Sequence, residues 1–356
     1  AYFVPFISHY MPGLATHEKG VGFFIAFCGI YFWPAIEISI RKALKMKIEK
    51  AQEKDFAAIN TELIGLLKQY EISPFTLSLQ LIQAHFVAFN LRKPEEGKAI
   101  IKKALELQLN DYEAAQAKME LADILLYEEK FNQALLYYSQ IELDLKNDIV
   151  AHEASLKAAK TSYFKTDFVW ALKQFKELKS ANTQLIANDA LEYFLLINDN
   201  TVADSTQTAL GAFAKGDFLL YQNRIQEAII QFQTILQKHK GEEIEAVTLL
   251  RLGKVFEKRG DFTLALSQYQ NIIDHHADGI YIDEALYFSA EIENNKLQQP
   301  EKAKPLSPKR WPDVTTMTVA FGHGIAVTPI HMAQGYVTML NGGYVIPLTL
   351  SKKPYG

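Results

Sequence analysis

The chain has 356 residues, of which 49% are hydrophobic and 22% are charged, and its formal net charge is −4 at pH 7. This length suggests more than one domain, and the composition is that of a folded protein rather than a disordered one. A slightly acidic chain has no electrostatic basis for binding nucleic acid. The single cysteine, Cys28, cannot form an internal disulfide, and no Cys/His zinc pattern is present, so we expect no metal site.

The first 44 residues contain an apolar segment without charged side chains, over residues 20–36. Its length is at the lower limit for a helix that spans a membrane, and the basic residues after it favour a cytoplasmic location for the remainder of the chain. We therefore predict a membrane span over residues 20–40. The alternative is a buried, aromatic-rich helix that breaks at Pro34. A secretory signal peptide is less favoured, because the basic residues come after the apolar run instead of preceding it.

Small residues recur at a fixed spacing between residues 45 and 305. Five of them are separated by 37, 37, 57 and 37 residues: Gly97, Ala134, Ala171, Ala228 and Ala265. Four of these have another small residue twelve positions earlier: Ala122, Ala159, Gly216 and Gly253. A spacing of this size is typical of stacked structural repeats.

Each repeat has the pattern of two helices. Apolar residues follow each phased small residue with helical periodicity, as in Ala265, Tyr269 and Ile272. Short polar stretches separate the two helices and favour antiparallel packing. Gly260 suits the left-handed residue that ends a helix, and Asp261 suits the N-cap of the next one. The 57-residue step predicts an additional helix over about 183–198.

This pattern resembles the tetratricopeptide repeat family, which has a small residue in each helix and an aromatic residue four positions after the second. The period of 37 exceeds the usual length of about 34 residues in that family. The resemblance implies an all-α fold, a right-handed superhelical solenoid of antiparallel helix hairpins over 45–305. We expect a short mixed α/β segment to follow it over 306–356.

The same resemblance implies that the first helix of each hairpin lines a concave groove for a protein or peptide partner. The positions one after and three before the first small residue would face this groove: Met119, Asp123, Leu156, Lys160, Phe213, Asp217, Leu250 and Lys254. An extended peptide or a helix is the natural ligand of such a groove. The alternative is that these charges only solvate the surface or pair between repeats.

The periodicity stops after Pro305. A β-rich stretch over 310–320 precedes a glycine turn and a helix over 330–340, for which Thr328 is the expected N-cap and Pro329 the first residue. The run from Phe321 to Pro329, followed by 332–336 and the Asn-Gly-Gly of 341–343, resembles the transpeptidase domain of class B penicillin-binding proteins, which cross-link peptidoglycan. This resemblance covers about residues 310–350.

The catalytic motifs of that family are incomplete here. The family requires Ser-x-x-Lys, Ser-x-Asn and Lys-Thr-Gly. Neither Lys-Thr-Gly nor Lys-Ser-Gly occurs. A Ser-x-x-Lys at 39–42 lies beside the apolar run, and a Ser-x-Asn at 180–182 lies at the end of a repeat helix. We therefore predict no catalytic residues, and no enzyme activity.

Other ligand motifs are also incomplete. The glycines at 211 and 216 have the spacing of a phosphate loop but lack its Lys, and the adjacent His275 and His276 point to different faces of a helix. We expect no cofactor.

Three functional hypotheses remain. The first is a non-enzymatic interaction scaffold at a bacterial cell envelope, anchored through residues 20–40, or otherwise in the cytoplasm. The second is a fragment of a peptidoglycan transpeptidase, inactive as it stands, and the third is a membrane protein whose span is the functional part. The abrupt loss of periodicity also raises the hypothesis that residues 305–310 join two unrelated proteins, through gene fusion, engineering or an assembly error.

Overall fold

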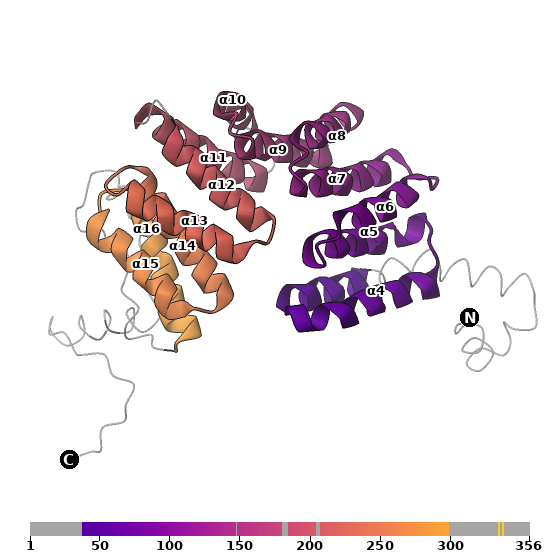
Figure 1. Ribbon diagram of the computed structural model, residues 1–356, viewed down its shortest axis with the longest axis horizontal. Helices are drawn as coiled ribbons and strands as arrows, with labels where there is room; N and C mark the ends of the chain where they lie inside the picture. The colour runs from indigo at the N-terminus through magenta and orange to yellow at the C-terminus, as the bar shows by residue number, and fades with distance from the viewer. Residues whose placement is uncertain are drawn as a thin grey trace, which may run out of the picture. The chain divides into compact units, whose positions relative to one another are not determined.

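The computed structural model describes residues 38–146, 148–179, 184–203 and 207–298, together with residues 334 and 337. Within these residues every regular element is a helix and no strand occurs, which confirms the predicted all-α class (Figure 1). None of the helices in these ranges is both long and apolar enough to cross a membrane. The apolar run over 20–36, the β-rich stretch and the proposed junction at 305–310 lie outside them.

The chain divides into two compact units. Unit 1 comprises Ala1–Thr161 and Ala181–Ile186, and unit 2 comprises Ser162–Ser180 and Ala187–Gly356. The described helices of unit 1 are 38–50, α4 (Phe56–Tyr70), α5 (Leu77–His85), α6 (Pro94–Leu105), α7 (Asp111–Tyr127), α8 (Phe131–Asp144) and most of α9 (Ile149–Phe164). Those of unit 2 are α10 (Phe168–Leu178), most of α11 (Gln184–Ala203), α12 (Thr208–Tyr221), α13 (Ile225–Lys238), α14 (Ile244–Arg259), α15 (Phe262–His275) and α16 (Ile282–Glu291).

Four short helical turns complete these elements. The 3₁₀ turns η1 (Glu53–Asp55) and η2 (Pro74–Thr76) precede α4 and α5, and the π-helical turns η3 (Phe86–Asn90) and η4 (Ile292–Lys296) extend α5 and α16. Successive helices pack against each other, most extensively in the pairs α7–α8, α12–α13 and α14–α15. These pairs are the predicted hairpins. The right-handed superhelix predicted for them stays a prediction.

The turns inside the hairpins share one backbone geometry. A residue with positive φ stands five positions before each phased small residue: Arg92, Glu129, Thr166, Asn223 and Gly260. In four of the turns the next N–H donates to a carbonyl five residues earlier, at 2.8–2.9 Å, as between Asp261 and Phe256. This bond satisfies a carbonyl that the end of the helix leaves unpaired. The repeat seen in the sequence is therefore also a repeat of backbone conformation.

The phased small residues lie in the core. All four phased alanines, Ala134, Ala171, Ala228 and Ala265, are fully buried. A Cβ added to Gly216 would lie 2.5 Å from Phe232, and one added to Gly253 would lie 2.3 Å from Tyr269. The aromatic residue of the second helix thus packs directly onto the backbone of the first, which is the reason for the spacing.

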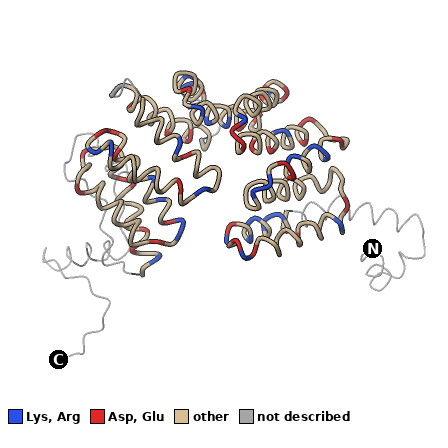
Figure 2. The backbone as a smooth tube through the Cα atoms, viewed as in Figure 1, with Lys and Arg blue, Asp and Glu red and all other residues tan. Residues whose placement is uncertain are grey.

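The long step in the repeat corresponds to an additional helix, as predicted. It is α11, which runs from Gln184 to Ala203 and is somewhat longer than the expected 183–198. Of the C-terminal segment, Gln334 and Val337 are described, and both are helical, within the helix expected over 330–340. Figure 2 shows that basic and acidic residues are interspersed along the helices of both units.

Candidate functional site

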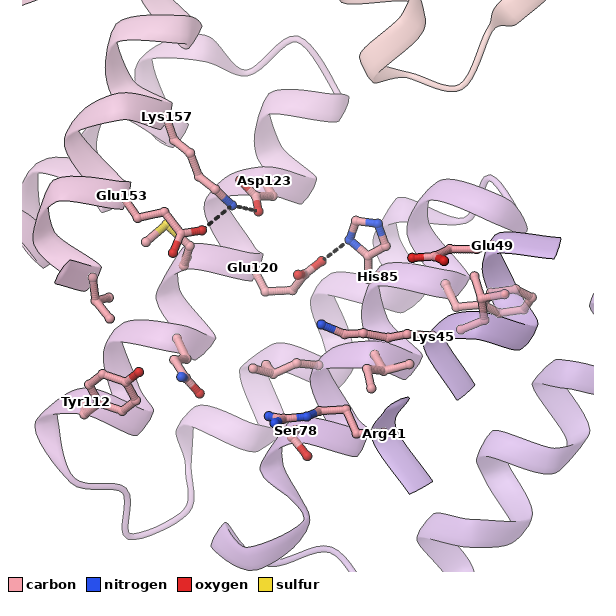
Figure 3. A pocket seen from close by; sticks show the side chains of 17 residues that line it. Arg41, Lys45, Glu49, Ser78, His85, Tyr112, Glu120, Asp123, Glu153 and Lys157 are labelled. Carbon is pink, nitrogen blue, oxygen red and sulfur yellow. Dashed lines mark hydrogen bonds and ion pairs between the residues drawn. The ribbon is translucent and has the colours of Figure 1, made fainter. Parts of the chain in front are cut away.

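A groove of about 550 Å³ lies in unit 1. Its lining comes from the 38–50 helix, α5, η3, α7 and α9 (Figure 3). These elements alternate along the chain with α4, α6 and α8, which do not contribute to it. The groove therefore follows one face of the stack, the face of the first helices, and we call it the unit 1 groove.

One end of the groove holds a hydrogen-bonded charge cluster. The Nζ of Lys157 lies 2.5 Å from Oδ2 of Asp123 and 3.8 Å from Oε1 of Glu153. The hydroxyl of Tyr138 donates to Oδ1 of Asp123 at 2.6 Å. Burial alone would lower the pKa of Lys157, but the Asp123 carboxylate outweighs it and raises that pKa. The Lys157 ammonium therefore stays charged at neutral pH.

A histidine lies in the middle of the groove. Nδ1 of His85 is 2.9 Å from Oε1 of Glu120, and the imidazole stacks on Phe89 with ring centroids 4.2 Å apart. Burial would lower the pKa of His85, but the hydrogen bond and the charge of Glu120 outweigh it and raise that pKa above its ordinary value. The raised pKa favours the protonated imidazole of His85 beside Glu120.

Two basic side chains from one helix face the groove at its other side. Arg41 and Lys45 lie one turn apart on the 38–50 helix and line it (Figure 3). Neither forms an ion pair with any residue that the structure describes, whereas Glu120, Asp123 and Glu153 all have basic partners. Together with Glu49, one turn further along the same helix, Arg41 and Lys45 give this edge of the groove two positive charges and one carboxylate.

The structure places the predicted groove residues of unit 1 in two groups. Met119 and Asp123 are part of the lining. Leu156 is buried and Lys160 is partly buried, and neither is part of the lining, where α9 instead contributes Glu153 and Lys157. Sequence reasoning missed His85, Glu120 and Lys157. The signal for the last two was available, because each lies three residues before a predicted charge on the same helical face.

In unit 2 the predicted groove residues make internal contacts. Phe213, Leu250 and Asp217 are buried, with at most 6% of each residue exposed. Asp217 lies 3.1 Å from Nε of Arg251 and accepts a hydrogen bond from the Tyr163 hydroxyl. The Nζ of Lys254 is 2.9 Å from Glu284. Contact of these residues with a partner stays a prediction.

The candidate catalytic spacings do not form an active site in the part of the chain that the structure describes. Ser39 and Lys42 both lie exposed on the 38–50 helix, and residues 180–182 are outside the described ranges. A serine nucleophile needs a neighbouring base that is held ready to accept its proton, usually away from bulk water. Across the described helices, no three His, Cys, Asp or Glu side chains are grouped to hold a metal ion.

The match to a known protein family concerns the C-terminal part of the chain. The family model of the penicillin binding protein transpeptidase domain matches residues 287–356. A stretch of 61 residues is 41% identical to the probable peptidoglycan D,D-transpeptidase FtsI of Caulobacter vibrioides (strain NA1000 / CB15N) and covers 17% of this chain. The chain spans only 10% of the length of that relative.

The family match begins earlier than the sequence pattern suggested, at residue 287 instead of about 310, and its first residues belong to α16. The tetratricopeptide resemblance of the helical part stays a prediction. Residues 287–356 are therefore similar to the transpeptidase domain of penicillin-binding proteins.

Proposed function

We propose that residues 287–356 are part of a bacterial peptidoglycan transpeptidase, and that this chain is a catalytically incomplete piece of such an enzyme. The family match to these residues, together with the 41% identity to a D,D-transpeptidase, is the observation that carries the proposal. It also favours a cell-envelope location over a cytoplasmic one, because peptidoglycan is an envelope polymer.

The chemistry explains why the piece is incomplete. The transpeptidase reaction needs a serine nucleophile, a lysine that acts with it and a Lys-Thr-Gly motif. The chain contains the stretch that in this family lies between the second and the third motifs, but no Lys-Thr-Gly. The exposed Ser39 and Lys42 do not supply the missing first motif, since water competes for every proton transfer between them.

A fluorescent penicillin tests the catalytic part of the proposal. The purified chain should show no covalent label that survives denaturing gel electrophoresis, whereas the Caulobacter transpeptidase provides the positive control. A label on the chain that disappears in a Ser39→Ala variant would show an active enzyme and contradict incompleteness. NMR secondary shifts test the family relation, with extended backbone expected over 310–320 and a helix over 330–340. Continuous helix across both ranges would contradict it.

The unit 1 groove supports a second candidate function, the binding of a peptide or helix of another protein. The observation that favours it is the position of Arg41 and Lys45, which face the groove without an ion partner among the described residues, beside the apolar side chains of Ile82 and Met119. A segment with carboxylates toward the 38–50 helix and apolar residues toward α7 has the matching chemistry.

Synthetic peptides test this second function. Two fluorescein-labelled 15-residue peptides would have the same apolar residues at the same positions. At the remaining, charged positions one peptide would carry Glu and the other Lys. We expect the acidic peptide to bind in fluorescence anisotropy and the basic one not to. The double change Arg41→Glu and Lys45→Glu should weaken binding at least about tenfold, as expected for loss of two charge contacts. Lys42→Glu, on the same helix but outside the groove lining, is the matched control. Equal binding of both peptides would contradict the proposal.

A further inference from the structure

The additional helix α11 contacts α10 and the last residues of α9 through two aromatic residues. The ring of Tyr193 stacks on Phe175 of α10 at 5.2 Å and meets the edge of Tyr163 of α9 at 5.1 Å. The Nζ of Lys179, just after α10, lies 4.4 Å from the ring centroid of Phe194. The middle of α11 therefore packs against α10 and against Tyr163 near the end of α9.

The neighbouring residue reaches a more distant hairpin. Oε1 of Glu192 is 3.2 Å from a terminal nitrogen of Arg251, on α14. Arg251 in turn lies 3.1 Å from Asp217 of α12 and 5.8 Å from the ring of Phe213. Phe213 and Asp217 are two of the residues that the sequence predicts to face a partner. In the structure α11 contacts them through Arg251.

The C-terminal part of α11 extends further along the stack. Residues 198–200 line a second pocket, of about 820 Å³, together with the 241–243 loop before α14 and the 275–281 stretch before α16. A helix stacked as an ordinary repeat element contacts only its immediate neighbours. Because the contacts of α11 reach from α9 and α10 to α14, past the helices next to it in the chain, it lies across the first-helix face of unit 2 and not only within the stack.

We propose that this face, formed by Tyr163, Phe213, Asp217 and Arg251, is a binding groove for an amphipathic helix, and that α11 occupies it as an internal ligand. The chemistry of the ligand is that of α11. The Glu192 carboxylate pairs with Arg251, and the ring of the adjacent Tyr193 contacts both Tyr163 and Phe175. Buried Ala190, Leu196 and Ile197 form its apolar side, and exposed Leu191 and Leu195 lie away from the groove. A partner helix with the same pair competes with α11. This inference is independent of the transpeptidase relation.

Hydrogen exchange on the full chain tests the internal contact. Tyr193→Ala should raise the exchange of amides 187–200 at least about tenfold and leave α12–α15 unchanged, because local opening is a separate event from unfolding of the unit. Glu192→Lys should act in the same direction to a smaller extent. Asn188→Lys, an exposed position one turn earlier on α11, is the matched control and should change little. Unchanged exchange in Tyr193→Ala, or an equal rise throughout α12–α15, would overturn the proposal.

A second experiment tests the groove in trans. Residues 187–200 are replaced by a Gly/Ser stretch of the same length, and a fluorescein-labelled peptide with the sequence of residues 184–203 is added. The peptide should bind the variant saturably and the intact chain at least about tenfold more weakly, because α11 competes there. A peptide with the Glu192→Lys and Tyr193→Ala changes should not bind. A folded variant that leaves the original peptide unbound overturns the proposal, and if the variant does not fold, the hydrogen-exchange result decides.

Discussion

Individual glycines and aromatic residues determine how closely the helices of a hairpin approach. Gly216 and Phe232 occupy equivalent positions to Gly253 and Tyr269, and in both pairs the aromatic ring fills the space that a Cβ would need. Interiors are packed tightly enough that one additional carbon atom displaces its neighbours. The phased small residues are therefore a steric requirement of the hairpin.

Alanine substitutions within α12 test this requirement. Gly216→Ala should lower the free energy of unfolding by about 1–2 kcal/mol, since the overpacking cost exceeds the gain in helix propensity. Gly211→Ala, in the same helix with open space around its Cβ, should instead raise it by about 0.5–1 kcal/mol. Urea unfolding followed by circular dichroism measures both. A stabilised Gly216→Ala variant would contradict the proposed ring contact.

The His85–Glu120 pair predicts a pH dependence of stability. Folding raises the pKa of His85, so the contact of protonated His85 with Glu120 stabilises the folded state. This stabilisation is fully present below pH 6.5, the ordinary pKa of histidine. This contribution is lost as the pH rises through the higher pKa of the folded state. The His85 side chain is 48% exposed, so the loss should be below about 1 kcal/mol.

Urea titrations between pH 6 and 8 measure this effect. The free energy of unfolding should fall as the pH rises in the unchanged chain, and it should fall less in the Glu120→Gln variant. His85→Gln should show the same flatter profile, because it removes the titrating group itself. A pH profile that stays the same in both variants would assign the titration to another residue.

At the scale of helices and turns, the hairpins depend on one recurring left-handed residue. Gly260 adopts this conformation without a steric cost, but Thr166 adopts it with φ of 65° although its side chain branches at Cβ. The next N–H, of Asp167, still completes the same closing hydrogen bond, at 2.9 Å. Tertiary packing therefore imposes the turn even where the local preference opposes it.

Replacing the strained residue tests this conclusion. Thr166→Gly should raise the free energy of unfolding by about 1 kcal/mol, because it removes the cost of a left-handed conformation. Thr263→Gly, the same change at an exposed position inside α15, should lower it by about 0.5 kcal/mol. Thermal unfolding of the two variants, compared with the unchanged chain, measures the difference. Destabilisation by Thr166→Gly would show that the threonine side chain itself supports the turn.

At the scale of the whole molecule, the helical repeat and the transpeptidase match overlap. The match begins at residue 287, yet residues 287–298 keep the helical repeat geometry. The ring of Phe288 stacks on Tyr269, and Ile292 is fully buried. Gln298 has the positive φ that the other turns show. The π-helical turn η4 before Gln298 has its counterpart in η3 before Arg92. Residues 287–298 of the match thus belong structurally to the repeat.

Two truncations separate these contributions. A chain that ends at residue 298 should keep the melting temperature of unit 2 within about 2 °C. A chain that ends at residue 286 loses the Tyr269–Phe288 stack and the buried Ile292, at a cost of about 2–5 kcal/mol for each large apolar side chain. Its melting temperature should fall by several degrees. Equal melting of both truncated chains would show that residues 287–298 do not support the stack.

The sequence predicts much of the fold and little of the site. Helical spacing and phased small residues identified the hairpins, the core alanines and the additional helix, because these depend on one helix and its adjacent turn. The site depends on residues far apart in the chain. His85 and Glu120 are 35 positions apart. The sequence predicts that Asp217 faces an open groove, whereas in the structure Asp217 contacts Arg251 and Tyr163.

The sequence alone therefore determined the helical period, the residues that each hairpin buries and the C-terminal relation to a transpeptidase domain. The tertiary structure decided which charges meet across helices, that Arg41 and Lys45 stay without an ion partner among the described residues, and that α11 covers the first-helix face of unit 2. The physical reason is that periodicity defines which side chains share a face of one helix. Which partner that face meets depends on how the helices pack together.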